Sequence, residues 1–303
     1  MKRIAILGGT GMAGHVAVAY LEEQGYNVFY MSGSAPHTEK SKGINAMHTH
    51  DLNEWLNFVE PDIIINCIGL LVTDSEKMPD KAIFLNAYLP RYLEQMYFNT
   101  SVKIIHLSTD CVFSGKHGGY NESDSPDGET VYDRSKALGE INNDKDLTFR
   151  MSIIGPDSNS SGTGLFNWFM KQQGDIQGFT KAIWNGVTTI ELARAIDAAL
   201  HQDLTGLYHL VYREPIDKYS LLTLFRDIMG KTDVNIEPSD NFVVDKTLVN
   251  TRTDFDFEVQ TYPKQIIDMR DWILRNVEVY GHYRLQRLQT SIVRISEGRF
   301  RII

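Results

Sequence analysis

The amino-acid sequence predicts an α/β fold with a doubly wound, mostly parallel sheet and a smaller C-terminal region interleaved with it. Short apolar, β-branched runs alternate with longer segments of helical period over the first two-thirds of the chain. This alternation is typical of parallel strands joined by right-handed crossovers, with helices on both faces. A glycine-rich turn directly follows the first run, and 303 residues with 42% hydrophobic side chains suffice for a sizeable core.

The elements of this sheet are predicted in order along residues 1–150, which we assign to a first domain. Strands are expected where Val, Ile and Leu cluster between turn residues, at 3–7, 27–31, 63–68, 102–107 and 147–151. Helices are expected where apolar residues recur every three or four positions, at 12–24, 51–59, 79–98 and 131–141. Because strands and helices alternate, we expect the strands to lie parallel with both faces buried.

The pattern changes after residue 151, where a loop rich in Gly, Ser and Asn is followed by further helices. These helices are predicted at 165–173, 190–201, 219–229 and 263–279, with one more strand at 206–211. The helix at 190–201 and the strand at 206–211 can rejoin the sheet. We therefore expect residues 151–283 to form a second region that is partly interleaved with the first domain.

The last segment, 284–303, differs in composition from the rest of the chain and forms a basic tail. It has one acidic residue, Glu297, against five arginines, which are Arg284, Arg287, Arg294, Arg299 and Arg301. The sequence leaves two interpretations open, an appendage that is non-native or disordered, or a segment that docks on a partner.

Charge and composition exclude several classes of function. The 30 basic and 39 acidic residues give a net charge of −9, which argues against nucleic acid or an anionic membrane surface as a partner. No apolar run approaches the roughly 20 residues that span a bilayer, and no secretory signal is recognisable, so a cytoplasmic location is expected. Cys67 and Cys111 have no zinc-site spacing. His48, His50 and Asp51 read as solvated loop residues, so no metal is expected.

The glycine-rich turn has the spacing of a dinucleotide-binding loop, with Gly8, Gly11 and Gly14 between the first strand and a helix. Glycine allows the backbone to turn tightly and to approach a pyrophosphate, whose charge the helix N-terminus stabilises. Thr10 and Met12 lie in the same turn and are expected to line the cofactor. This context favours a Rossmann-type dinucleotide site over a tight turn without a ligand.

The second strand indicates which dinucleotide is bound. It ends at Ser32 without the carboxylate that would hold both hydroxyls of the NAD ribose. Small hydroxyl residues, followed by His37, Lys40 and Lys42, would tolerate or attract a 2′-phosphate. NADP is therefore the expected cofactor, with NAD as the alternative. Asp51 and Leu52 are expected to flank the adenine, although Asp51 could instead cap a helix.

A phenol and an amine are spaced one helical turn apart at Tyr132 and Lys136. A tyrosine with an ordinary pKa near 10 is a poor acid–base group, but a nearby lysine cation and a nicotinamide cation both favour its phenolate. The strand at 102–107 leads into hydroxyl residues, among them Thr109. Because strands end at the same edge of a parallel sheet, we expect these three side chains to meet beside the glycine loop.

In these motifs the sequence resembles the extended short-chain dehydrogenase/reductases, and among them the dTDP-4-dehydrorhamnose reductase-like sugar-nucleotide reductases. The resemblance covers roughly residues 2–280. It rests on the three glycines, on Tyr132 with Lys136, on Arg150, and on the segments Asn66-Cys67-Ile68-Gly69, Leu85-Asn86-Ala87 and Ser108-Thr109-Asp110-Cys111-Val112-Phe113-Ser114-Gly115. It implies a dinucleotide-binding domain at 1–150 and a substrate-binding region at 151–283.

The resemblance also implies a role for each residue of the site. Thr109 would hydrogen-bond the substrate carbonyl, Tyr132 would protonate the developing alkoxide, and Lys136 would anchor the nicotinamide ribose. Cys67, Ile68 and Gly69 would line the cofactor, and Asn86 would support the site or its proton relay. The substrate would contact Asp110, Cys111, Phe113, Trp184 and Asn185. For Trp184 and Asn185, a core tryptophan beside a turn asparagine is the competing interpretation.

The implied reaction is the NAD(P)H-dependent reduction of the 4-keto group of a nucleotide-activated 6-deoxy or amino sugar, in the synthesis of cell-surface polysaccharide precursors. Sugar dehydratases of this superfamily have Thr-Asp-Glu, whereas here Cys111 follows Asp110, which argues against dehydration. Two alternatives stay open: an epimerase/reductase that uses Cys111, or a regulatory subunit without turnover. The expected partner is the nucleotide sugar, with a homodimer as an option.

Overall fold

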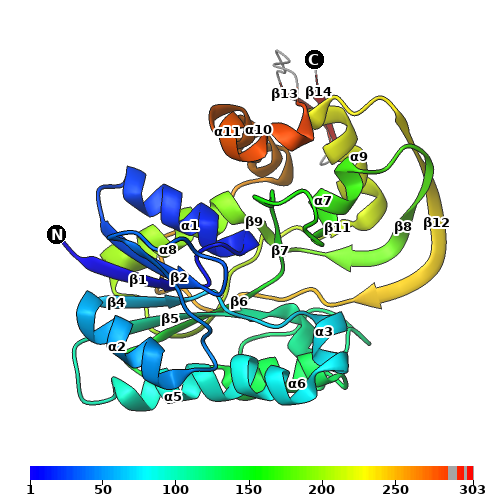
Figure 1. Cartoon of the computed structure of the whole chain (residues 1–303). Helices are drawn as coiled ribbons and strands as arrows, with labels where there is room; N and C mark the ends of the chain where they lie inside the picture. The colour runs from blue at the N-terminus through cyan, green and yellow to red at the C-terminus, as the bar shows by residue number, and fades with distance from the viewer. Residues whose placement is uncertain (286–291, 297–298, 303) are drawn as a thin grey trace.

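The computed structural model describes residues 1–285 in full and the backbone of 292–296 and 299–302. A central sheet runs in the order β10-β6-β5-β4-β1-β2-β3, and every neighbouring pair is parallel (Figure 1). Its strands are β1 Arg3–Leu7, β2 Asn27–Ser32, β3 Ser41–Gly43, β4 Ile63–Asn66, β5 Lys103–Thr109, β6 Leu147–Met151 and β10 Gly206–His209. The predicted doubly wound fold is therefore confirmed, and the segment near 206 does rejoin the sheet as β10.

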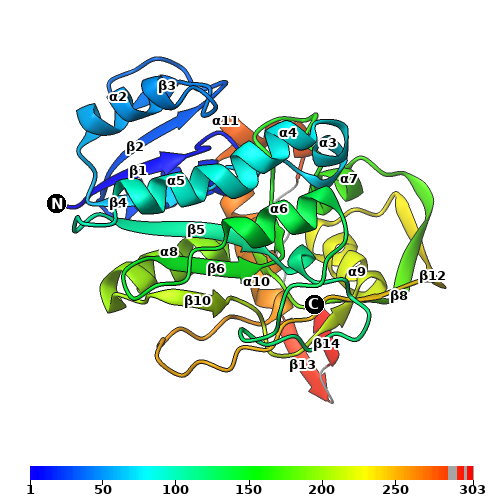
Figure 2. The ribbon, with the colours of Figure 1, turned by 90° about the horizontal axis from the view of Figure 1, so that it is seen from below.

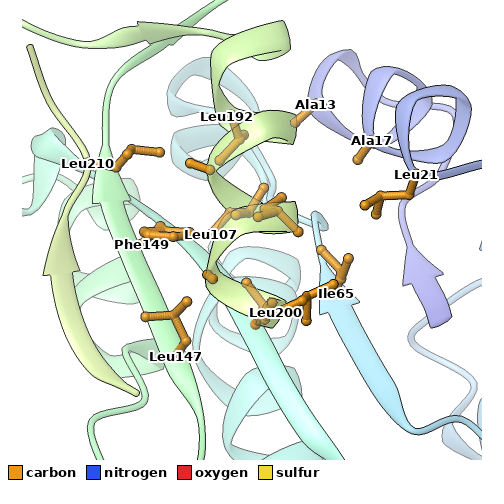
Figure 3. Packing of buried hydrophobic residues seen from close by; sticks show 14 of the residues in the cluster. Ala13, Ala17, Leu21, Ile65, Leu107, Leu147, Phe149, Leu192, Leu200 and Leu210 are labelled. Carbon is orange, nitrogen blue, oxygen red and sulfur yellow. The ribbon is translucent and has the colours of Figure 1, made fainter. Parts of the chain in front are cut away.

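Helices cover both faces of this sheet, which explains why the central strands β1 and β4 are mostly apolar. On one face α1 (Met12–Glu23) packs against α8 (Thr189–Gln202), and α10 (Tyr262–Arg275) contacts α8. Figure 3 shows Ala17 and Leu21 of α1 and Leu200 of α8 directed into this core. The other face is covered by α2 (Thr49–Val59), α5 (Leu89–Met96) and α6 (Val131–Gly139) (Figure 2).

The helix predicted at 79–98 is interrupted in the structure. It consists of α4 (Pro79–Ala82), a π-helical segment η1 (Ile83–Tyr88) and α5, and the short helix α3 (Val72–Lys77) precedes it. A π-turn inserts one residue into the helical repeat, which periodicity alone does not show, and such turns are frequent at functional sites. Here the turn contains the fully buried Asn86.

A second, three-stranded sheet was not predicted. β8 (Gly174–Trp184) pairs in parallel with β12 (Val234–Asp245) and antiparallel with β11 (Ile216–Asp217), and the two long strands extend away from the body in Figure 1. Many β8 and β12 residues are polar and exposed, so these strands lack an apolar run. The same region contains the short pair β7 (Ile153–Ile154) and β9 (Val187–Thr188) and the helices α7 (Leu165–Met170) and α9 (Lys218–Met229).

The described part of the chain ends with α11 (Val277–Tyr280) and η3 (Gly281–Tyr283). Beyond them the backbone of β13 (Ile292–Ser296) pairs antiparallel with that of β14 (Arg299–Ile302). The basic side chains predicted for the tail lie outside the described residues, except for Arg284. Among the described helices, none combines the length and apolar character that crossing a bilayer requires.

A buried ion pair joins the end of α6 to β6 of the central sheet. Arg150, which is only 2% exposed, donates to both carboxylate oxygens of Glu140 over 2.6 and 2.7 Å. Glu140 also accepts from the Ser108 hydroxyl at 2.7 Å, and an Arg150 N–H lies 3.0 Å from His209 Nε2. Because the charges are paired and hydrogen-bonded, their burial is tolerated. Removal of one partner leaves the other as a buried charge without compensation.

We expect Arg150→Met to reduce the free energy of unfolding by about 3–5 kcal/mol, because Glu140 then keeps a buried charge without its partner. Urea denaturation measures this loss. The double variant Arg150→Met/Glu140→Met should be more stable than Arg150→Met alone. Lys181→Met, which breaks the exposed Lys181–Asp240 pair, serves as the control and should leave stability unchanged. An equal loss of stability in Arg150→Met and in Lys181→Met would contradict this account.

Candidate active site

The candidate site lies where β1, β4 and β5 end at the same edge of the sheet. Leu7 of β1 is in register with Asn66 of β4, and Asn66 with His106 of β5. The segments after these residues therefore emerge side by side. They are the glycine loop, the loop Cys67–Gly69 and the turn that begins at Thr109.

The glycine loop has two positions, Gly8 and Gly14, at which the backbone favours glycine. Gly8 adopts φ +81°, a left-handed conformation that favours glycine, and its amide donates to the Met31 carbonyl at 2.8 Å. A Cβ atom at Gly14 would overlap the Gly8 carbonyl oxygen. Gly11 is the N-cap of α1 and has no side-chain cap, and the first turn contains no acidic residue. The positive end of this helix is thus suited to an anionic group near Met12.

Hydroxyl groups gather at the end of β2. The Thr10 hydroxyl lies 2.7 Å from that of Ser32 and 3.0 Å from that of Ser34. No carboxylate follows Ser32 directly, and Lys40 and Lys42 are exposed nearby along the chain.

The two residues predicted to flank the adenine have different surroundings. Leu52 is fully buried among core side chains of α2 and the sheet, so only its backbone is left to flank the adenine, and that contact stays a prediction. Asp51 is exposed in the first turn of α2. The N-cap of this helix is His48, so the alternative interpretation of Asp51 as the capping residue is wrong.

The exposed histidines near Asp51 form separate pairs. His48 Nδ1 lies 3.7 Å from an Asp51 carboxylate oxygen, and His50 Nε2 lies 3.5 Å from one of Glu54. Over the described residues, no group of three or more His, Cys, Asp and Glu side chains is arranged to hold a metal ion.

The loop Cys67–Gly69 lies against the glycine loop. The Cys67 amide donates to the Leu7 carbonyl at 2.9 Å, and a Cβ atom at Gly8 would lie 3.1 Å from the Ile68 side chain. Gly69 is exposed, whereas Cys67 and Ile68 are half-buried. Desolvation raises the pKa of Cys67 to about 12, so its side chain stays a thiol.

Tyr132 and Lys136 are positioned by the start of α6. Thr130 caps this helix by accepting from the Asp133 amide, while the Asp133 carboxylate accepts from the Thr130 amide. Burial raises the pKa of Tyr132, and the nearby Cys111 and Asp110 raise it further, while a hydrogen bond with Thr109 opposes them. The structure thus brings the phenol and the Thr109 hydroxyl together.

Lys136 is buried on the inner side of the same helix face. Its Nζ donates to the Leu107 carbonyl at 2.6 Å and lies 3.5 Å from His106 Nε2. Desolvation lowers the pKa of Lys136 to about 8, against the opposing effects of the negative Glu140 and of Cys67. In this structure burial dominates and raises the pKa of Tyr132, and the expectation that Lys136 and a nicotinamide cation together favour its phenolate stays a prediction.

Asn86, in the π-helical segment η1, is hydrogen-bonded both to the loop after β4 and to α6. Its side chain accepts from the Leu70 amide at 2.8 Å and donates to the Leu70 carbonyl and to the Ser135 hydroxyl, each at 3.1 Å. Ser135 in turn donates to the Tyr132 carbonyl at 3.0 Å. The π-turn therefore holds the loop after β4 next to the helix that carries Tyr132 and Lys136.

Two lysines near Asp110 were missed by the sequence analysis. Burial raises the pKa of Asp110, whereas Lys246 and Lys218 lower it. Lys218 begins α9, and its Nζ lies 4.7 Å from the centre of the Trp184 ring. Desolvation lowers the pKa of Lys218 to about 8. No local motif marks either lysine, because only the packing of α9 and β12 brings them to Thr109 and Asp110.

Phe113, predicted to contact the substrate, has a structural role instead. It is fully buried and stacks on Tyr120 with ring centres 4.1 Å apart, with Arg150 over its ring. The turn of η2 (Asp110–Val112), which Thr109 caps, directs Phe113 into the core. The prediction is therefore wrong.

The predicted contacts of Trp184 and Asn185 are also corrected in favour of the competing interpretation. Trp184 is 4% exposed and packs on Tyr262. The Asn185 side chain donates to the Leu248 carbonyl at 2.7 Å and accepts from the Leu248 amide at 3.1 Å. Both side chains thus stabilise the junction of β8 with the segment after β12.

The fold and this edge define the class: a Rossmann-type protein of the extended short-chain dehydrogenase/reductase kind. The model of one family, the RmlD substrate binding domain, matches residues 1–244, and the chain belongs to this family. Among curated relatives, the probable low-salt glycan biosynthesis reductase Agl14 of Haloferax volcanii is 32% identical over 162 residues. That match covers 49% of this chain and 52% of Agl14, so the chain spans about half the length of that relative.

Two further likenesses cover more of the chain. The methionine adenosyltransferase 2 subunit beta of Xenopus laevis is 23% identical over 252 residues, which cover 78% of this chain and 75% of that protein. The crystal structure of a Bacillus anthracis dTDP-4-dehydrorhamnose reductase in complex with NADP covers 90% of this chain and 99% of its own, with a TM-score of 0.77 and 20% identity. At that identity the structure supports the fold alone.

We expect both cysteines to react slowly with a disulfide reagent. Desolvation raises the pKa of Cys67 and of Cys111 to about 12. At about pH 8 the thiolate fraction should be about a thousandfold below that of an ordinary thiol. Because a more basic thiolate is also more nucleophilic, the rate should be about 30–100-fold lower, and it should increase with pH. The absorbance change of 5,5′-dithiobis(2-nitrobenzoate) measures it. Cys67→Ala and Cys111→Ala separate the two signals, and urea-unfolded protein is the fast control. Rapid modification of native Cys111 would contradict this assignment.

Proposed function

We propose that this protein reduces the 4-keto group of a nucleotide-activated 6-deoxy or amino sugar, with NAD(P)H as the hydride donor. The observation that carries the proposal is that Thr109, Tyr132 and Lys136 lie together at the edge of the sheet where the glycine loop begins. The names of the reductase relatives support a role in the synthesis of glycans or cell-surface polysaccharides. A cytoplasmic location and a homodimer remain expectations attached to this proposal.

The glycine loop fits a dinucleotide. Close contact of Gly14 with Gly8 leaves room only for backbone there, and the uncapped start of α1 would face the pyrophosphate. Cys67, Ile68 and Gly69 would line the same cofactor from the next loop, and Lys136 would hold the nicotinamide ribose. When bound, the reduced nicotinamide supplies the hydride.

The hydroxyl cluster at the end of β2 supports NADP over NAD. Thr10, Ser32 and Ser34 can together donate to the oxygens of a 2′-phosphate. The exposed His37, Lys40 and Lys42 would add positive charge. A carboxylate at this position would repel the phosphate, and none directly follows the strand.

Thr109 and Tyr132 would act on the ketone. Both hydroxyls can donate to its oxygen, and these hydrogen bonds strengthen as the oxygen gains negative charge, which stabilises the transition state more than the substrate. Tyr132 would then transfer its proton to the alkoxide. In this structure burial raises the pKa of Tyr132 and keeps the phenol protonated, and the positive nicotinamide formed by hydride transfer would favour its phenolate.

Neither alternative function has a supporting observation in the site. Epimerisation through Cys111 needs a group that exchanges protons near neutral pH, but desolvation raises the pKa of this thiol to about 12. A regulatory subunit need not keep Thr109, Tyr132 and Lys136 together. Turnover measurements decide between these functions.

We expect Tyr132→Phe to reduce kcat/KM for ketone reduction by about 10²–10⁴-fold, because the proton donor is lost. The assay follows NADPH absorbance with a panel of 4-keto sugar nucleotides carrying dTDP, UDP or GDP. NADPH binding, measured by fluorescence, should persist in this variant. Tyr88→Phe, on the exposed surface of η1, is the matched control. Retained turnover in Tyr132→Phe would exclude the mechanism, and an inactive wild type across the panel would exclude the function.

We expect Ser32→Asp to shift cofactor preference from NADPH toward NADH by about tenfold or more, because a carboxylate repels the 2′-phosphate and can accept from ribose hydroxyls. The ratio of kcat/KM for the two cofactors measures the shift. Ser101→Asp, at an exposed position just before β5, controls for added charge. An unchanged ratio in Ser32→Asp would place the 2′-phosphate elsewhere.

A further inference from the structure

A buried histidine lies directly beneath Lys136 and has no role in the mechanism above. His106 of β5 is 0% exposed. Its Nε2 lies 3.5 Å from Lys136 Nζ, and its Nδ1 lies 3.2 Å from Asn66 Nδ2 at the end of β4. The imidazole thus bridges the lysine and the residue that precedes the loop Cys67–Gly69.

The direction of these hydrogen bonds follows from one backbone group. The Ile68 amide donates to Asn66 Oδ1 at 3.1 Å. A backbone N–H can only donate, so the atom facing it is the oxygen and the atom facing His106 is the amide nitrogen. Asn66 therefore donates to His106, and His106 Nδ1 must accept.

The hydrogen of His106 is then on the other ring nitrogen. Burial lowers the pKa of His106 well below its ordinary value, and the positive charges of Lys136 and Arg91 lower it further, so the ring is neutral. A neutral imidazole has one N–H, and with Nδ1 accepting, it is Nε2–H, which points at Lys136 Nζ. A neutral Lys136 amine can accept this hydrogen while donating to Leu107, but an ammonium group cannot.

We propose that Asn66 and His106 couple the charge of Lys136 to the loop Cys67–Gly69, which makes His106 a positioning residue for the reaction. When Lys136 gains a proton from solvent, its Nζ becomes a donor only, and His106 must move its hydrogen from Nε2 to Nδ1. That hydrogen faces the Asn66 amide nitrogen, so the amide rotates and loses the bond from the Ile68 amide. The consequence for the cofactor rests on the function proposed above.

The charges around this pair leave Lys136 able to titrate in an accessible range. Glu140 on α6 and Cys67 after β4 favour its ammonium form, while desolvation opposes it and brings its pKa to about 8. Arg91 on α5, like Lys136, lowers the pKa of His106. His106 itself stays neutral throughout this range, so only its tautomer can respond.

Nitrogen-15 NMR of the histidine-labelled wild type tests the coupling without turnover. His106→Asn and His106→Gln identify the His106 signals by their loss. We expect the Nε2–H tautomer at about pH 10 and a change toward Nδ1–H as the pH falls to about 6.5, with the midpoint at the titration of Lys136. Lys136→Met should abolish the change. One tautomer over the whole range in the wild type would overturn the proposal.

Kinetics provide the second test. In His106→Asn the side-chain oxygen can accept from Lys136, so the ammonium form is favoured and the alkaline limb of kcat/KM should move up by about one pH unit. Thr148→Val is the matched control, because Thr148 pairs in register with His106 and is equally buried. An unmoved limb in folded His106→Asn would overturn the proposal. A wild type without ketone reduction would refute the proposed function instead, and the NMR result would still decide the coupling.

Discussion

The parallel arrangement of β1, β4 and β5 is the constraint on which the rest of the site depends. Parallel strands end at one edge, so the segments after Leu7, Asn66 and Thr109 emerge together although about 100 residues separate them. Helices on both faces bury nearly all of β1, β4, β5 and β6, and this packing sets the positions of the groups that the proposed reaction requires close to each other.

The edge itself is stabilised by buried polar contacts rather than by packing alone. The Arg150–Glu140 pair and Ser108 lie on one side of Lys136, and His106 with Asn66 lies on the other. Each of these groups is satisfied by a partner from another element, which is the condition under which burial of polar groups is tolerated. The same contacts surround the Lys136 amine with defined charges and donors, so structure and chemistry depend on the same residues.

The fold and the location of the candidate site could be predicted because their signals are local. Gly8, Gly11 and Gly14 follow a strand, Tyr132 and Lys136 lie one turn apart, and periodicity distinguishes the buried strands from the helices. The errors have physical causes. Phe113 and Trp184 are aromatic residues near the site, but whether an aromatic side chain faces a ligand or the core depends on the path of the chain, which periodicity does not describe.

By itself the sequence determined the doubly wound sheet, the glycine-rich turn between the first strand and a helix, and the one-turn spacing of Tyr132 and Lys136, since each is encoded by residue type and short-range spacing. Only the tertiary structure decided which side chains surround them. Lys218 and Lys246 reach Asp110, and His106 reaches Lys136, through contacts between elements distant in sequence. Burial then sets the pKa values of these groups, and burial is a property of the folded chain that no local pattern contains.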